Sequence, residues 1–230
     1  VRLCFKFIIH LSIDNNIRDI IWFVKHERKN IMKHLYNVPI CSNSLFIYQL
    51  DVKNDLISKF KKEKFKSAEY SDGGCSLIGK DLNVLRKYRE LNKEIIKAVN
   101  ATIKDVLMLE DVNYRIFSSW LTKTDPGGSS DPHSHTNSWL SGVYYPKGNT
   151  SFSIKFYNDN ITQFHTPPKK FNIYNSGEWS IHPDDNYLIL FFSQLRHKIM
   201  ANNSNEDRYS LAFNILPKGK FGVGDSTVVF

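Results

Sequence analysis

The chain has 230 residues, of which 41% are hydrophobic and 13% aromatic. This composition predicts a folded globular protein with one sizeable core and excludes an intrinsically disordered chain. The formal net charge is +8 at pH 7. The lysines are spread along the chain, concentrate in its first half and accompany no recognition helix or aromatic RNA-binding motif, which disfavours a nucleic-acid-binding protein.

The cysteines and the apolar segments bear on the compartment. Cys4, Cys41 and Cys75 are an odd number without zinc-site spacing, which predicts free thiols in a reducing compartment. No apolar run is long enough to span a membrane. The apolar start at residues 1–11 is interrupted by polar residues and lacks a cleavage site for a secretory signal. We therefore expect a cytoplasmic protein with no membrane partner.

Residues 1–37 carry no functional motif. They predict a strand-like piece followed by a helix at about residues 18–36. We interpret them as an N-terminal extension that the fold can dispense with, so that a chain starting at Met32 folds like the full chain. Residues 38–230 are expected to form the functional domain.

The next part of the chain favours helices after one strand. Residues 44–50 are rich in strand formers, and 54–66 predict a short helix with Asn54 as its cap. Residues 81–109 predict a long helix capped by Asp81, because apolar residues recur every three or four positions. The stripe consists of Leu82, Val84, Leu85, Tyr88, Leu91, Ile95, Ile96, Val99, Ile103 and Val106.

After residue 110 the apolar period changes to two. A strand is predicted at 114–121, followed by a loop at 125–130. Further strands are predicted at 138–146, 151–157, 171–175, 178–182, 187–192, 197–201 and 206–216. Many short strands at such spacing are typical of a β-sandwich or barrel. The predicted fold class is therefore mainly β with flanking helices (α+β).

Two separate stretches offer candidate metal ligands. His133 and His135 form an H-x-H pair, which places both imidazoles on one side of an extended backbone. His197 at the start of a later strand could complete a set of three ligands, and Arg208 offers a bidentate clamp for a carboxylate. Each feature alone also fits a surface histidine or a rim salt bridge. Their order along the chain favours an iron oxygenase with an oxo-acid cosubstrate.

The same segments carry a family resemblance. From about Tyr114 to Asn214 the chain resembles the Fe(II)/2-oxoglutarate-dependent oxygenases of the double-stranded β-helix fold, and most of all a small phage and bacterial group of them. The quoted segments are Pro132-His133-Ser134-His135, Leu140-Ser141-Gly142-Val143-Tyr144-Tyr145, Leu188-Ile189-Leu190-Phe191-Phe192-Ser193, His197 and Arg208-Tyr209-Ser210-Leu211-Ala212-Phe213-Asn214.

The resemblance implies a role for particular residues. His133, His135 and His197 would be the metal ligands, with His135 where the wider superfamily has a carboxylate, and Asp131 is the alternative third ligand. Three neutral imidazoles would leave Fe(II) with a higher net charge than two imidazoles and a carboxylate. The 2-oxoglutarate site would comprise Arg208 and Tyr145, with Tyr144 as the alternative to Tyr145, and Ser210 and Asn214 would face the same pocket by strand alternation. No catalytic residue beyond the metal ligands is implied.

The resemblance also implies a double-stranded β-helix (jelly-roll) core, Fe(II) as cofactor and 2-oxoglutarate as cosubstrate. The activity would be O₂-dependent hydroxylation of a C–H bond with release of succinate and CO₂. The substrate class stays open between a small molecule, a protein side chain and a nucleobase, and so does the oligomeric state. Two rival functions remain: a three-histidine, cupin-like dioxygenase that needs no 2-oxoglutarate, and a non-catalytic β-sandwich binding module.

Overall fold

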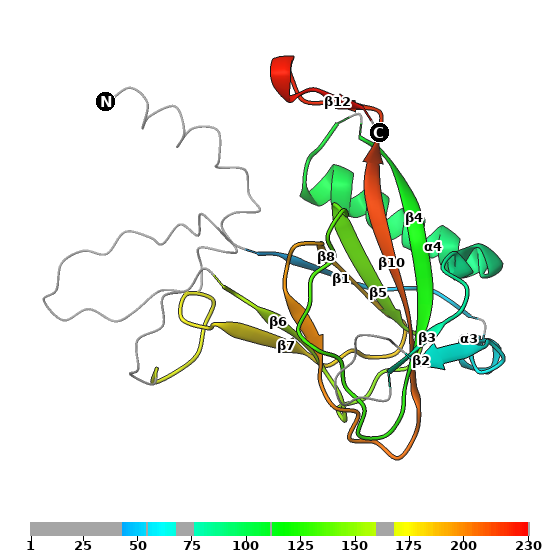
Figure 1. Cartoon of the computed structure of the whole chain (residues 1–230). Coiled ribbons are helices and arrows are strands. Elements are labelled where there is room, and N and C mark those ends of the chain that lie inside the picture. The colour runs from blue at the N-terminus through cyan, green and yellow to red at the C-terminus, as the bar shows by residue number, and fades with distance from the viewer. Residues whose placement is uncertain (1–42, 54, 68–75, 111, 160–167, 230) are drawn as a thin grey trace, which may run out of the picture. The chain divides into compact units, whose positions relative to one another are not determined.

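The computed structural model describes residues 43–53, 55–67, 76–110, 112–159 and 168–229 (Figure 1). These residues belong to one compact unit, Asn43–Phe230. The strand and helix predicted within residues 1–37 lie outside the described residues, and the dispensable extension stays a prediction. No helix in the described part of the chain is long and apolar enough to cross a membrane.

Most helices of the described residues lie before residue 107, and most strands follow them. The helices are α3 (Leu56–Phe60), η1 (Val84–Lys87), α4 (Arg89–Ala101), the π-helical η2 (Thr102–Val106) and η3 (Gly224–Ser226). The strands are β1 (Leu45–Gln49), β2 (Phe65–Ser67), β3 (Ser76–Gly79), β4 (Asn113–Thr124), β5 (Leu140–Tyr145), β6 (Ile154–Tyr157), β7 (Glu178–Ile181), β8 (Tyr187–Phe192), β9 (His197–Ile199), β10 (Arg208–Lys218), β11 (Lys220–Phe221) and β12 (Val228–Val229).

The described residues form two larger antiparallel sheets and a two-stranded sheet of β11 and β12. The major sheet has the strand order β1-β8-β5-β10-β4-β3-β2, and the minor sheet has the order β7-β6-β9. In Figure 1, α4 lies across the strands of the major sheet, while β6 and β7 form a separate layer. This arrangement confirms the predicted mainly β fold with flanking helices.

The major sheet has two apolar faces, each with its own core cluster. The helical cluster joins residues such as Tyr144 and Phe213 of the sheet to Leu91 and Ile95 of α4. The inter-sheet cluster joins major-sheet side chains to minor-sheet side chains and consists of Val143, Tyr145, Phe152, Ile154, Phe156, Ile189, Phe191 and Leu195. Adjacent residues alternate between the clusters because successive side chains of a strand point to opposite faces.

The long helix predicted at 81–109 is broken. Tyr88 has φ −113° and ψ 71°, which separates η1 from α4. The Tyr88 ring packs against Phe60 at 5.0 Å between ring centroids, and its hydroxyl donates to Glu63. Asp81 accepts a hydrogen bond from the Asn83 backbone before η1 and does not cap a helix. Tertiary contacts therefore override the helical period, and the stripe members Leu82, Ile96 and Val106 are exposed.

Two further predicted elements were wrong. Of the helix predicted at 54–66, α3 alone is helical, Asp55 caps it, and residues 65–67 form strand β2. Asn54 lies outside the described residues. Phe65 leaves the helix because its ring packs on Tyr209 at the sheet edge. The strand predicted at 171–175 is a turn, closed by hydrogen bonds between the side chains of Asn172 and Asn175 and neighbouring backbone amides.

Candidate functional site

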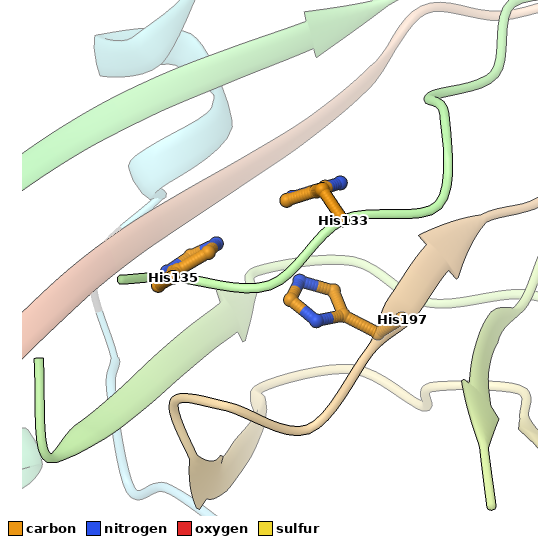
Figure 2. A group of neighbouring side chains, drawn as sticks. All are labelled: His133, His135 and His197. Carbon is orange, nitrogen blue, oxygen red and sulfur yellow. The ribbon is translucent and has the colours of Figure 1, made fainter. Parts of the chain in front are cut away.

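Three histidine side chains meet between the two sheets. His133 and His197 form an antiparallel β-bridge, with backbone hydrogen bonds of 2.9 and 2.8 Å in the two directions. The backbone amide of His135 donates to the carbonyl of Ser193 at 2.8 Å. Each ring offers one nitrogen, and these atoms lie within 4.8 Å of one another. Figure 2 shows the rings converging from one loop and from the start of β9, so the structure brings the predicted ligands together.

Hydrogen bonds determine the tautomer of the first and third rings. His133 Nδ1 lies 2.7 Å from the carbonyl oxygen of Asp131, and His197 Nδ1 lies 2.9 Å from that of Leu195. A carbonyl oxygen only accepts, so both Nδ1 atoms carry the proton. In a neutral ring, Nε2 then holds the free lone pair that a metal needs.

Burial favours the neutral rings. Burial and the neighbouring His133 lower the pKa of His197 to about 3. Burial also lowers the pKa of His135, more than its hydrogen bond to Asn214 raises it. At neutral pH both rings are uncharged, and uncharged imidazole is the form that binds metals.

Asp131 does not join this group. Within the described part of the chain, the metal-competent group around this point consists of the three histidines. Asp131 instead contributes its backbone carbonyl, which holds His133. The histidine set is therefore better supported by the geometry than the alternative with Asp131.

Arg208 lies on the inter-sheet face of β10 and is buried, with 4% of its surface exposed. Its Nη2 donates to the hydroxyl of Thr124, whereas Nε and Nη1 have no hydrogen-bond partner. Its guanidinium carbon lies 4.9 Å from the ring centre of Phe152 and 5.7 Å from that of Tyr145. No carboxylate of the described residues pairs with it. A buried cation with two unpaired donor nitrogens is suited to a bound anion.

The two adjacent tyrosines have different environments. The Tyr145 hydroxyl is buried without a hydrogen-bond partner and lies in the inter-sheet cluster beside Arg208. Burial raises its pKa, so it remains a hydroxyl donor. Tyr144 faces the helical cluster and its hydroxyl donates to Asn186 at 2.5 Å. Tyr145, and not Tyr144, therefore shares a face with Arg208.

The other two predicted cosubstrate residues lie on the same face of β10. Ser210 is buried and is paired in register with Thr122. Asn214 is paired with Ser141 of β5, and its side-chain oxygen lies 2.6 Å from His135 Nδ1. In the structure Asn214 thus contacts a candidate ligand.

Several residues of this region escaped the sequence analysis. Thr124, Ser141 and Ser193 make hydrogen bonds to Arg208 or around His135. The rings of Phe156 and Phe191 lie 5.9 and 4.8 Å from that of His197. Their recognition requires knowledge of strand pairing, which one sequence does not supply. The nearest signal was the position of Ser141 and Ser193 within the quoted motifs.

Comparisons with known proteins agree with this geometry. Residues 118–214 match the model of the family described as "Putative 2OG-Fe(II) oxygenase". No curated protein gives a significant match.

Solved structures show the same fold at low identity. A prolyl hydroxylase from Trichoplax adhaerens, solved with a peptide fragment of the hypoxia inducible factor oxygen degradation domain, has a TM-score of 0.53 at 12% identity, covering 76% of this chain and 84% of that chain. HygX from Streptomyces hygroscopicus, solved with nickel, 2-oxoglutarate and hygromycin B, has a TM-score of 0.53 at 8% identity. The match covers 76% of this chain and 83% of that chain. A Pseudomonas putida prolyl-4-hydroxylase has a TM-score of 0.50 at 14% identity, and the match covers 77% of this chain and 95% of that chain.

These structural matches confirm the predicted double-stranded β-helix core. The family match covers the three histidines, Tyr145 and Arg208 together. Over residues 118–214 the chain is therefore similar in sequence to the 2OG-Fe(II) oxygenase family, and over most of its length it has the fold of the solved 2OG oxygenases.

Proposed function

We propose that this protein is an Fe(II)- and 2-oxoglutarate-dependent oxygenase that hydroxylates a C–H bond and releases succinate and CO₂. The observation that carries the proposal is the combination, on one face of the major sheet, of the histidine group with the unpaired buried guanidinium of Arg208. The family match supports the same activity.

The donor set fits an iron ion. Imidazole nitrogen is a suitable ligand for Fe(II), and three protein ligands leave positions open for a chelating cosubstrate and O₂. His133, His135 and His197 would hold the ion. Because all three ligands are neutral, the ion would keep its full charge and attract an anionic oxo acid strongly.

The residues around Arg208 fit the carboxylate of 2-oxoglutarate that would lie away from the metal. Arg208 Nε and Nη1 and the Tyr145 hydroxyl are buried donors without partners, and a carboxylate can accept from all of them. The rung between this end and the Asn214–Ser141 pair is formed by Ala212 and Val143. These modest side chains leave room along the sheet face for a short dicarboxylic acid.

When bound, iron and 2-oxoglutarate supply the oxidising chemistry, as cofactors do in general. The chain supplies orientation and exclusion of water. Phe156 and Phe191 flank the His197 ring, and Phe152 covers the guanidinium of Arg208. Such an apolar enclosure strengthens the charge interactions within the pocket.

Arg208 also distinguishes the proposal from its rivals. A three-histidine dioxygenase without 2-oxoglutarate has no need for a buried cation, and a non-catalytic β-sandwich has no need for the histidine group. Substrate choice remains between a small molecule and a protein side chain. The relatives differ in this respect, since one was solved with a peptide and another with hygromycin B.

The first test is reconstitution of the full chain with Fe(II) under anaerobic conditions, followed by metal analysis and assay of succinate release. We expect about one iron per chain and succinate formation from 2-oxoglutarate after O₂ is admitted, faster when a peptide or metabolite panel contains the substrate. His197→Ala should lose iron and turnover. His182→Ala is the control, since His182 is exposed and does not belong to the group of three histidines. Iron binding without 2-oxoglutarate binding would favour the cupin-like rival.

A further inference from the structure

His135 differs from the other two candidate ligands in what holds its ring. His133 and His197 place Nδ1 against backbone carbonyls close in sequence. His135 places Nδ1 2.6 Å from the side-chain oxygen of Asn214, which is 79 residues away, and 3.0 Å from the hydroxyl oxygen of Ser141. The orientation of this one ring therefore depends on side chains of two strands, and the shorter contact is the one to Asn214.

The amide of Asn214 is itself held in one orientation. Ser141, its register partner on β5, donates its hydroxyl to Asn214 Oδ1 at 2.8 Å. That hydroxyl proton is then unavailable for Ser193, so the Ser193 hydroxyl donates to Ser141 Oγ, also at 2.8 Å. Both hydroxyls are buried. In this arrangement the amide oxygen of Asn214 accepts from Ser141 and faces His135 Nδ1, so that it can accept from both.

The backbone supports this orientation of the Asn214 side chain. On β10, Asn214 continues the alternation of Arg208 and Ser210 and pairs in regular register with Ser141 of β5. Its side chain therefore faces the loop that carries His135, whose backbone amide donates to the Ser193 carbonyl.

We propose that Asn214 is a positioning residue for the third metal ligand: its amide oxygen keeps His135 in the Nδ1–H tautomer, with Nε2 free for the ion. The inference rests on the proposed function in that the three histidines hold the metal. It changes the role of Asn214 from the predicted cosubstrate contact to support of a ligand. With the opposite tautomer, Nε2 would carry a proton and could not bind.

The test compares metal affinity among three variants of the full chain. Cobalt(II) serves as the probe, titrated against intrinsic fluorescence, because the Trp120 ring lies 5.7 Å from the His135 ring; absorption of the bound cobalt checks the ligand set. Asn214→Leu keeps the size and removes the acceptor, and we expect affinity to fall about 10- to 100-fold. Asn214→Asp keeps an acceptor and should retain affinity. Asn100→Leu is the matched control, because Asn100 lies on α4 and its side-chain oxygen likewise accepts a hydrogen bond, from Tyr114 of β4.

The outcomes separate this inference from the proposed function. Absence of cobalt binding by the wild-type chain overturns the proposed function and the inference with it. Wild-type binding with unchanged affinity in Asn214→Leu overturns the inference alone. A fall in Asn214→Asp as large as that in Asn214→Leu also overturns it, because the acceptor would then be irrelevant.

A second measurement takes its main result from the wild-type chain, so it holds even where the variant folds poorly. Nitrogen-15 NMR of the imidazoles in the metal-free wild type should show His135 as the Nδ1–H tautomer, like His197. In Asn214→Leu we expect the His135 signals to move towards the Nε2–H form while those of His197 stay unchanged. An Nε2–H tautomer of His135 in the wild type would overturn the inference.

Discussion

At the scale of single residues, the buried and unpaired charge of Arg208 gives the clearest reason to expect a bound anion. An unpaired charge in a protein interior is strongly unfavourable, and an arginine does not escape this by losing its proton. Burial does lower the pKa of Arg208, while the neighbouring Tyr145 raises it. One contact to the Thr124 hydroxyl leaves much of the guanidinium unsatisfied. An anion that fills this position would relieve a cost already present in the folded chain.

The corresponding prediction concerns cosubstrate affinity. Arg208→Ala should weaken 2-oxoglutarate binding by about 30-fold or more, the usual effect of removing one partner of a buried charge pair. Arg208→Lys should recover only part of this loss, because an ammonium cannot form the parallel pair of hydrogen bonds. Binding is measured by anaerobic titration of the iron-loaded protein, following the absorption of the chelate.

Arg86→Ala provides the control for this titration. Arg86 is 71% exposed and lies 3.6 Å from Asp81, on the helical side of the fold. Its removal should leave 2-oxoglutarate affinity unchanged. If wild type and Arg208→Ala bind 2-oxoglutarate with equal affinity, Arg208 does not anchor the cosubstrate. The cupin-like dioxygenase would then be the better-supported function.

At the scale of elements, strand alternation explains what could be predicted. Arg208, Ser210 and Asn214 were expected to share a face, and their register partners Thr124, Thr122 and Ser118 follow at the same spacing. The quoted motif around Gly142 also has a local cause. A Cβ there would lie 2.3 Å from the Phe213 ring and 2.7 Å from Leu190, so the strand needs a residue without a side chain.

The elements that could not be predicted depend on distant partners. The break at Tyr88 and strand β2 arise from ring contacts with Phe60 and Tyr209. For the same reason the sequence indicated Asn214 as a pocket residue but not as the partner of His135. A periodic pattern reports which face is apolar; it does not report what that face will meet.

The minor sheet gives a prediction at this scale. His197, Phe156 and Trp179 are register partners across β9, β6 and β7, so their side chains share one face. Phe156 is buried against Phe191 at 5.1 Å between ring centroids, whereas Trp179 is 48% exposed. Phe156→Ala should lower the free energy of unfolding by about 3–5 kcal/mol. Urea denaturation followed by circular dichroism measures this loss.

Trp179→Ala is the matched comparison, because it also removes a large ring from the same face. Its cost should be clearly smaller, about 1 kcal/mol. Losses of similar size in the two variants would show that the edge strand β7, and not only the enclosed strand β6, supports the inter-sheet core. Phe156→Ala should in addition weaken metal binding, because its ring packs beside that of His197.

At the scale of the whole molecule, the candidate centre connects the two sheets. His197 opens β9 of the minor sheet, and the backbone of His135 is held by Ser193, directly after β8 of the major sheet. The inter-sheet cluster lies beneath the same region. Metal binding should therefore depend on an intact pairing of the sheets, more than on any helix.

This dependence leads to the last prediction. Both core clusters of the described part of the chain are built from residues between 45 and 215. We therefore expect a chain that starts at Met32 to retain its metal affinity and to melt within roughly 5 °C of the full chain, which corresponds to about 1–2 kcal/mol for a domain of this size. Thermal denaturation of both chains, with and without cobalt(II), measures this. A larger drop would mean that apolar residues such as Phe5 and Phe7 fill part of the core, and the boundary at residue 37 would then be wrong.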